Sequence, residues 1–275
     1  MLATIKKNKL KSKIIKYKST DIFYRTIGEG MAVVLLHGFA EDGDVWRYQI
    51  DFLKNHFRLI VPDIPGSGSS AFNILLSTIE DYAEAIKAIL DNEKITESIL
   101  IGHSMGGYIT LAFAEKYPQL LKAFGLFHST AFADTEEKKQ TRLKAIDFIK
   151  NSGTNAFIKT STPALFSEEF KINNPEAVEE LIERNNKFTS EALIQYYRAM
   201  IARPERTQVL KNSTKSVLFI AGEKDNVIPL QGILRQVHLP IQSHIHILAN
   251  SAHMGMWEES TKANKILLGF LQMIG

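Results

Sequence analysis

The sequence contains no cysteine among its 275 residues. A thiol nucleophile, a zinc–thiolate site, an iron–sulfur cluster and a disulfide are therefore all excluded. Long apolar runs are also missing, since no segment approaches the ~20 continuous apolar residues that cross a bilayer. The stretch after Met1 lacks the apolar core and small-residue cleavage site of a secretory signal. We therefore expect a cytoplasmic protein without a membrane partner.

Positive charge is concentrated at the start of the chain. The net charge is +3, but residues 1–18 hold seven lysines and no acid, which leaves −4 for residues 19–275. We interpret residues 1–18 as a basic, solvated leader rather than a nucleic-acid-binding tail. The chain is 45% hydrophobic and 23% charged, as in an ordinary globular protein, and its length suits one large domain or two small ones.

Short apolar runs alternate with longer amphipathic ones, a pattern typical of strand–helix–strand units. The near-continuous apolar character of the short runs predicts strands covered on both faces. After an opening hairpin formed by residues 14–17 and 22–27, the predicted strands are Ala32–Leu36, Arg58–Val61, Ser98–Ile101, Ala123–Phe127, Val217–Ala221 and His244–Leu248. The sequence thus predicts an α/β fold with a mostly parallel twisted sheet and helices on both faces.

Residues 131–212 interrupt this alternation, because they carry helix signals and no convincing strand. Asp134 and Glu137 have capping-box spacing, and Asn174 followed by Pro175 indicates another helix start. We predict that residues 131–212 form a helical cap, inserted between two parts of the core domain at residues 19–130 and 213–275. An insertion of this length favours a functional role such as a lid.

The segment Ser98–Gly107 reads S-I-L-I-G-H-S-M-G-G, in which a buried-type strand leads into G-x-S-x-G and then a helical pattern. A serine on such a sharp strand-to-helix turn has a strained backbone and an exposed hydroxyl. Close packing at the turn leaves no space for side chains at Gly102 and Gly106. The pattern therefore predicts Ser104 as a nucleophile.

A serine hydroxyl needs a general base within hydrogen-bond reach and a third group that orients the base. His253 lies in a small-residue loop after the last predicted strand, and we favour it as the base, with His128 as the competitor. Asp225 follows the predicted strand Val217–Ala221, and we favour it over Glu223 as the orienting acid. The chain order Ser104, Asp225, His253 is that of a nucleophile-elbow hydrolase.

Acyl transfer also needs donors for the developing oxyanion. A predicted strand ends in H-G-F-A, so the loop can present the amide of Phe39, with the amide of Met105 as its partner at a helix start. His37 and Gly38 then shape the loop. The side chains predicted to line the substrate pocket are Phe39, His128, Phe157, Phe166, Tyr196 and Met200, with Phe188 and Tyr197 also available. The candidates within residues 131–212 recur at helical spacing, so packing within the core of the cap would also explain their apolar character.

These motifs together resemble the α/β-hydrolase fold family, specifically its small esterase and lipase-like members with a helical cap. The resemblance rests on H-G-F-A, P-D-I-P-G-S-G-S, G-H-S-M-G-G, G-E-K-D-N-V-I-P and S-A-H-M, and spans about residues 20–275. The resemblance implies that Ser104, Asp225 and His253 form the triad and that the amides of Phe39 and Met105 form the oxyanion hole. Ser67 stands where the family usually has histidine, without an expected catalytic consequence, and we assign Asp63 a structural role in that turn. Dehalogenases and epoxide hydrolases of this fold use an aspartate as the nucleophile, so the serine at position 104 argues against both activities.

We therefore predict a serine esterase that acts on a small apolar ester, thioester or lactone, with no metal or cofactor and no nucleic-acid partner. A C–C bond hydrolase and a cofactor-free perhydrolase share these motifs. A third possibility is a ligand receptor or signalling protein whose triad turns over slowly. Acyl-chain length, leaving group and oligomeric state are not encoded in any motif.

Overall fold

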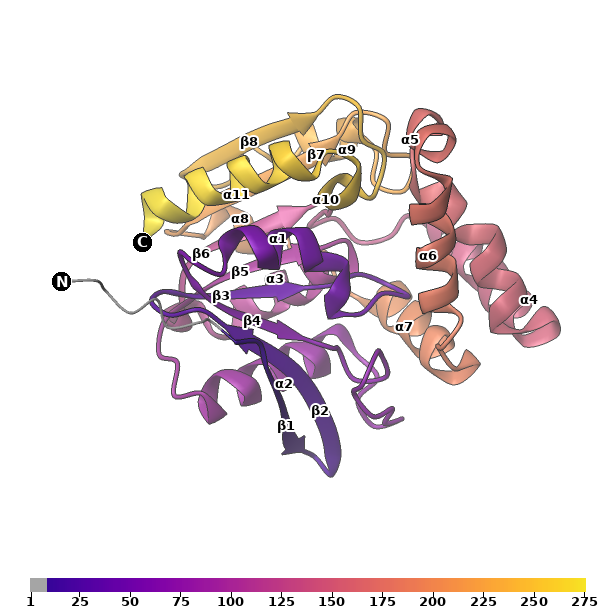
Figure 1. Ribbon diagram of the computed structural model, residues 1–275, viewed down its shortest axis with the longest axis horizontal. Helices are drawn as coiled ribbons and strands as arrows, with labels where there is room; N and C mark the ends of the chain where they lie inside the picture. Colours follow the sequence, from indigo (N-terminus) through magenta and orange to yellow (C-terminus); the bar gives the residue numbers. More distant parts are fainter. Residues whose placement is uncertain (1–8) are drawn as a thin grey trace.

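A computed structural model describes residues 9–275 and contains one eight-stranded sheet in the order β1-β2-β4-β3-β5-β6-β7-β8 (Figure 1). The strands are β1 (Lys11–Tyr17), β2 (Thr20–Ile27), β3 (Ala32–Leu36), β4 (Arg58–Pro62), β5 (Ser98–His103), β6 (Leu121–Phe127), β7 (Ser216–Gly222) and β8 (Ser243–Leu248). The pairs β1–β2 and β2–β4 are antiparallel, and every other pair is parallel. The predicted α/β fold with a mostly parallel sheet is confirmed.

The central strands are rich in apolar residues, and every residue of β3, β5 and β7 is buried. A strand buried on both faces requires helices on both sides of the sheet. The helices that follow the core strands are α1 (Arg47–Leu53), α2 (Ile79–Asn92), α3 (Met105–Lys116), α9 (Leu230–Leu234), α10 (Gly255–Glu258) and α11 (Ser260–Ile274), with short 3-10 turns η1 (Gly43–Trp46) and η2 (Pro118–Leu120).

The strand order determines which face each helix covers. The crossover from β3 to β4 runs in one direction along the sheet, and the crossover from β4 to β5 runs in the other. Because such crossovers are right-handed, α1 and α2 are placed on opposite faces. The packing agrees, since α1 contacts α11 while α2 contacts α3.

The chain between β6 and β7 contains helices and connecting loops but no strand. It contains α4 (Glu136–Ser161), η3 (Pro163–Leu165), α5 (Glu168–Asn173), α6 (Pro175–Asn185), α7 (Ser190–Ala202) and α8 (Thr207–Lys211). Gly153, with φ of 80°, interrupts α4. Figure 1 shows α4 to α7 beyond the carboxyl ends of the parallel strands. That is the edge at which α/β proteins bind ligands.

The predicted leader at residues 1–18 is wrong for its second half, because residues 11–17 form β1. Residues 1–8 lie outside the described residues. β1 pairs only with β2, so it is an edge strand, and Lys11, Lys13 and Lys16 lie along it. Lysines are typical of edge strands because charge prevents pairing with another chain. Within the part of the chain that the structure describes, no helix is long and apolar enough to cross a membrane.

Candidate active site

Ser104 lies on the turn between the end of β5 and the start of α3. Its backbone has φ of 51° and ψ of −115°, a conformation that a residue with a side chain rarely adopts. Such a conformation costs about 1 to 3 kcal/mol and is typical of functional sites. The strand and the helix on either side hold the serine in place, as its motif predicts.

The glycines around Ser104 permit this turn, because a methyl group at either flanking position would collide with backbone atoms. A Cβ on Gly102 would lie 2.2 Å from the carbonyl oxygen of Gly106. A Cβ on Gly106 would lie 2.4 Å from the carbonyl oxygen of Leu36. The turn at Ser104 therefore packs directly on the end of β3, which brings the H-G-F-A loop beside Ser104.

Asp225 and His253 meet at the ends of β7 and β8. The Nδ1 atom of His253 lies 2.8 Å from Oδ2 of Asp225, and Oδ1 of Asp225 accepts hydrogen bonds from the amides of Val227 and Ile228. Burial would raise the pKa of Asp225, but the neighbouring imidazoles and these hydrogen bonds hold it well below its usual range. The carboxylate is therefore ionised, so Nδ1 of His253 donates to it and Nε2 is free to accept a proton.

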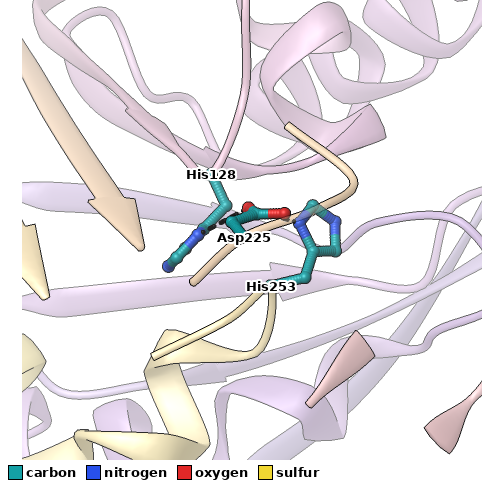
Figure 2. A group of neighbouring side chains, drawn as sticks. All are labelled: His128, Asp225 and His253. Atoms are coloured by element: carbon teal, nitrogen blue, oxygen red, sulfur yellow. Dashed lines mark hydrogen bonds and ion pairs between the residues drawn. The ribbon is translucent and has the colours of Figure 1, made fainter. Parts of the chain in front are cut away.

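A second imidazole contacts the same carboxylate oxygen. Figure 2 shows Asp225 between His253 and His128, and Nδ1 of His128 lies 3.0 Å from Oδ2. His128 is fully buried, has φ of 48°, and its Nε2 has no hydrogen-bond partner. Burial is the main cause that lowers its pKa to about 4, so His128 is neutral at pH 7. A Cβ on Gly255 would lie 2.4 Å from that Nε2, so the ring is packed inside the core.

A cavity of about 250 Å³ contains both Ser104 and His253 in its wall. Its other lining residues come from the loop after β3, from α3, from the chain between β6 and β7, and from the loop after β7: Phe39, Ala40, Glu41, Tyr108, Arg142, Phe157, Ser161, Thr162, Ala164, Leu165, Asn185, Tyr197, Met200 and Val227. A larger cavity of about 440 Å³ lies elsewhere, next to Asp42 and Arg184, but neither Ser104 nor His253 lines it. We assign the chemistry to the smaller cavity.

Three of the predicted pocket residues line this cavity and three do not. Phe39, Phe157 and Met200 line it. His128 is instead buried behind Asp225, and Phe166 stacks on Phe170 at a centroid distance of 5.2 Å. Tyr196 is turned toward the core, where its hydroxyl donates to the carbonyl of Pro65 at 2.8 Å. The expectation that these three contact substrate is corrected accordingly, and the neighbouring Tyr197 takes the place of Tyr196 in the lining.

The loop after β3 is held by several polar contacts. Nε2 of His37 accepts from the amide of Ile64, and Nδ1 lies 2.8 Å from the carbonyl oxygen of Gly38. The hydroxyl of Ser67 also lies 2.8 Å from Nε2 of His37. Asp63 is fully buried and accepts from Arg25 and the amide of Gly43. These contacts agree with the structural roles predicted for His37 and Asp63.

Glu41 and His103 form a buried pair that the sequence analysis did not identify. Oε2 of Glu41 accepts from the Gly38 amide at 2.6 Å and lies 3.0 Å from Nδ1 of His103. Nε2 of His103 lies 3.0 Å from the carbonyl oxygen of His253. Since both ring nitrogens face acceptors, both must carry protons. The charged pair thus connects the loop after β3, the turn at Ser104 and the loop of His253.

This pair predicts a pH-dependent contribution to stability. Burial opposes both charges, but mutual attraction wins, so the pKa of His103 is raised from 6.5 and that of Glu41 is lowered from 4.5. The Glu41 contribution is present above pH 4.5 and is lost as pH falls through its lowered pKa. The His103 contribution is present below pH 6.5 and is lost as pH rises through its raised pKa.

Glu41→Gln is therefore expected to lower the free energy of unfolding most between pH 4.5 and 6.5, with a difference that shrinks as pH rises further. Breaking a buried pair costs about 3 to 5 kcal/mol. Urea unfolding of both proteins across this pH range measures the difference. The exposed Glu223 provides the control, since Glu223→Gln should leave stability nearly unchanged. A difference between wild type and Glu41→Gln that grows above pH 7 would contradict an ionised pair.

Asp225, His128 and His253 are also the group of described residues whose donor atoms lie close enough together to hold a metal ion, all within 4.8 Å. Their Nδ1 and Oδ2 atoms already face one another at hydrogen-bond distance. A metal–ligand bond to nitrogen is about 2.0 to 2.1 Å long, so an ion would have to displace both hydrogen bonds. The arrangement fits proton transfer better than metal binding.

Comparisons with known proteins agree with this fold. The family model for the α/β hydrolase fold matches residues 31–260. The acetyltransferase component of the acetoin cleaving system of Pseudomonas putida is 25% identical over 88% of the chain, which spans 64% of that protein. The 2-hydroxy-6-oxo-6-phenylhexa-2,4-dienoate hydrolase of Comamonas testosteroni is 25% identical over 95% of the chain and 96% of its own length. An esterase of Thermogutta terrifontis superposes with a TM-score of 0.90, at 24% identity, over 96% of this chain and 99% of its own.

Proposed function

This chain belongs to the α/β-hydrolase fold family, and from that premise we propose that it is a serine hydrolase that cleaves a small, largely apolar carboxylic ester, thioester or lactone. The observation that carries the proposal is the hydrogen bond of 2.8 Å between His253 and Asp225, beside a cavity that His253 and Ser104 line together. The acid, the base and the nucleophile thus come from three strand ends at one edge of the sheet.

In the proposed reaction, Oγ of Ser104 attacks the substrate carbonyl while its proton moves to Nε2 of His253. Asp225 stabilises the imidazolium that forms. The C–O bond of the ester then breaks, and His253 returns the proton to the leaving alcohol, which leaves an acyl group on Ser104. A water molecule attacks this acyl-enzyme while His253 takes its proton; the bond between the acyl carbon and Oγ then breaks, His253 returns the proton to Oγ of Ser104, and the carboxylic acid is released.

We assign the oxyanion hole to the amides of Phe39 and Met105. Met105 is the first residue of α3, so its N–H is one of the helix donors without an intrahelical partner. Neither amide makes a hydrogen bond to another described residue. The partial positive charge at the start of a helix adds to the stabilisation of an oxyanion.

We further propose that residues 131–212 act as a cap over this site. Phe157, Tyr197 and Met200 from that segment line the cavity together with Ser104 and Phe39 from the core, and the ring of Tyr197 packs on that of Phe39 at a centroid distance of 4.2 Å. The amide of His253 also donates to the carbonyl of Leu165 at 2.9 Å, which ties the base loop to the cap. Substrate selection would then depend on cap side chains, and acyl transfer on the core.

A second candidate is hydrolysis of a carbon–carbon bond, because the relative from Comamonas testosteroni is named as a hydrolase of a dienoate. Both reactions use a serine, a base and an oxyanion hole. Parallel assays with an aryl ester and a vinylogous 1,5-diketone would separate them, since the ester hydrolase should turn over the ester faster.

A panel of 4-nitrophenyl esters of increasing acyl length, together with a fluorophosphonate probe, tests the proposal. We expect steady turnover that is fastest for short acyl chains, because the cavity holds only about 250 Å³. The probe should label one peptide, the one that contains Ser104. A single burst without steady turnover would favour a ligand receptor, and labelling of a different serine would overturn the assignment.

A further inference from the structure

A cation lies in the wall of the otherwise largely apolar cavity that contains Ser104. Arg142 projects from α4 and lines this cavity, and its side chain is only 12% exposed. Its guanidinium lies 5.7 Å from the ring centroid of Tyr197, and Tyr108 and Val227 line the same cavity. A charged group in such surroundings needs a partner of opposite charge, because burial removes much of its hydration.

The acid that pairs with Arg142 is shared with a second arginine. Nε and Nη2 of Arg142 donate to the carboxylate of Asp134 at 2.6 and 3.5 Å. Nη1 of Arg203 lies 2.9 Å from the same carboxylate, and its guanidinium stacks 3.8 Å above the ring of Tyr108. One negative charge therefore serves two guanidinium groups.

A lysine adds to this excess of positive charge. Nζ of Lys138, one turn before Arg142 on α4, donates to the carbonyl of Val227 and has no ion-pair partner among the described residues. Burial lowers the pKa of Lys138, and the two arginines lower it further. Arg142 and Arg203 thus share Asp134, and Lys138 pairs with no acid among the described residues, so these three cations and one acid leave about two positive charges uncompensated.

The other charged groups at the cavity do not offset this excess. Glu41 lines the cavity, but it is paired with His103 and the amide of Gly38. Asp225 lies behind His253, where two imidazoles share its carboxylate. The structure records no hydrogen bond from Nη1 of Arg142 to another described residue, so this nitrogen is available to a ligand in the cavity.

We infer that the substrate carries a carboxylate that binds Arg142, while its apolar body occupies the rest of the cavity. This inference rests on the proposed function and specifies its substrate class as a half-ester of a dicarboxylic acid, or an ester of a hydroxy acid. Arginine suits this task because its guanidinium keeps its charge when buried, and Nη1 can donate a charge-assisted hydrogen bond to a carboxylate while Nε and Nη2 stay on Asp134. The carboxylate can belong to the acyl part or to the alcohol part, and the experiment separates the two.

Matched pairs of substrates test the inference. For the acyl side, the pair is the 4-nitrophenyl half-ester of glutaric acid and the corresponding neutral amide. For the alcohol side, the pair is 4-acetoxybenzoate and 4-acetoxybenzamide. The wild-type protein should prefer the charged member of one pair by about 10- to 100-fold in kcat/KM, the range expected for a hydrogen bond to a charged group. A wild-type ratio near or below one for both pairs would overturn the inference.

Variants then assign the preference to Arg142. Arg142→Gln should reduce the charged-to-neutral ratio toward one, and Arg142→Lys should retain part of it. Arg198 is exposed on the neighbouring α7 and does not line the cavity, so Arg198→Gln is the matched control for loss of one positive charge and should keep the wild-type ratio. An unchanged ratio in a folded Arg142→Gln protein would overturn the role of Arg142.

Binding without turnover separates this inference from the proposed function. The Ser104→Ala variant should be stabilised thermally by the charged half-ester more than by its neutral amide. If the protein shows no Ser104-dependent hydrolysis but this difference is present, the hydrolase proposal fails and the carboxylate site stands. If hydrolysis depends on Ser104 but neither assay distinguishes charge, the carboxylate site alone fails.

Discussion

Ser104→Ala is expected to lower kcat for an activated ester by about 10⁴- to 10⁶-fold, the loss seen when a triad nucleophile is removed. Without the hydroxyl no acyl-enzyme forms, and only the oxyanion donors and substrate binding remain. The free energy of unfolding should change little, because alanine must adopt the same backbone angles as Ser104. Initial rates with 4-nitrophenyl acetate and a thermal melt measure the two effects.

Ser69→Ala is the matched control for this prediction. Ser69 is exposed, and its recorded hydrogen bond uses the backbone amide rather than the hydroxyl. An exposed substitution of this kind changes stability by no more than about 0.5 kcal/mol, and activity should remain at the wild-type level. Activity in Ser104→Ala within tenfold of wild type would show that another group is the nucleophile.

His253→Ala is expected to cause a comparable loss, about 10⁴- to 10⁶-fold in kcat. The variant retains the Ser104 hydroxyl but lacks a base that can accept its proton beside the cavity. Asp225→Asn should lose about 10⁴-fold, because an amide favours the wrong tautomer of His253. Combining these substitutions with Ser104→Ala should add little, since the three groups act as one unit.

His128 is the competing base, and the two imidazoles can be separated by substitution. His128→Asn suits the site because asparagine tolerates positive φ and its amide can donate to Asp225, as Nδ1 of His128 does. We expect this variant to keep most of its activity, with its effect mainly on stability. If His128→Asn abolished turnover while His253→Ala retained it, the base would be His128.

The turn that carries Ser104 could be located from local sequence because the residues that permit it lie within a few positions of one another. The strand and the helix on either side of Ser104 approach so closely that only glycine fits at positions 102 and 106, and the structure places Ser104 on such a turn. The buried strands could also be located from the sequence, because short continuous apolar runs bounded by turns are typical of strands that are covered on both faces. β1 was only partly anticipated, since its lysines resemble a solvated leader unless the sheet edge is known.

The candidate site also depends on contacts that no local pattern contains. Periodicity places Tyr196 and Tyr197 on a helix, but only the packing of α7 directs Tyr197 to the cavity and Tyr196 to the carbonyl of Pro65. Likewise, Glu41 and His103 are 62 positions apart in the sequence, and no local pattern in either segment indicates that they pair.

Short-range steric and hydrophobic constraints were thus readable from residue order, namely the α/β sheet and the serine turn with its glycines. The folded chain alone decided which imidazoles share Asp225, which residues of the segment 131–212 line the cavity with Ser104, and that Arg142 lines it while sharing its counter-charge with Arg203. The physical reason is that electrostatic pairing and cavity lining depend on distances between segments remote in sequence. Those distances are set by how helices pack on the sheet.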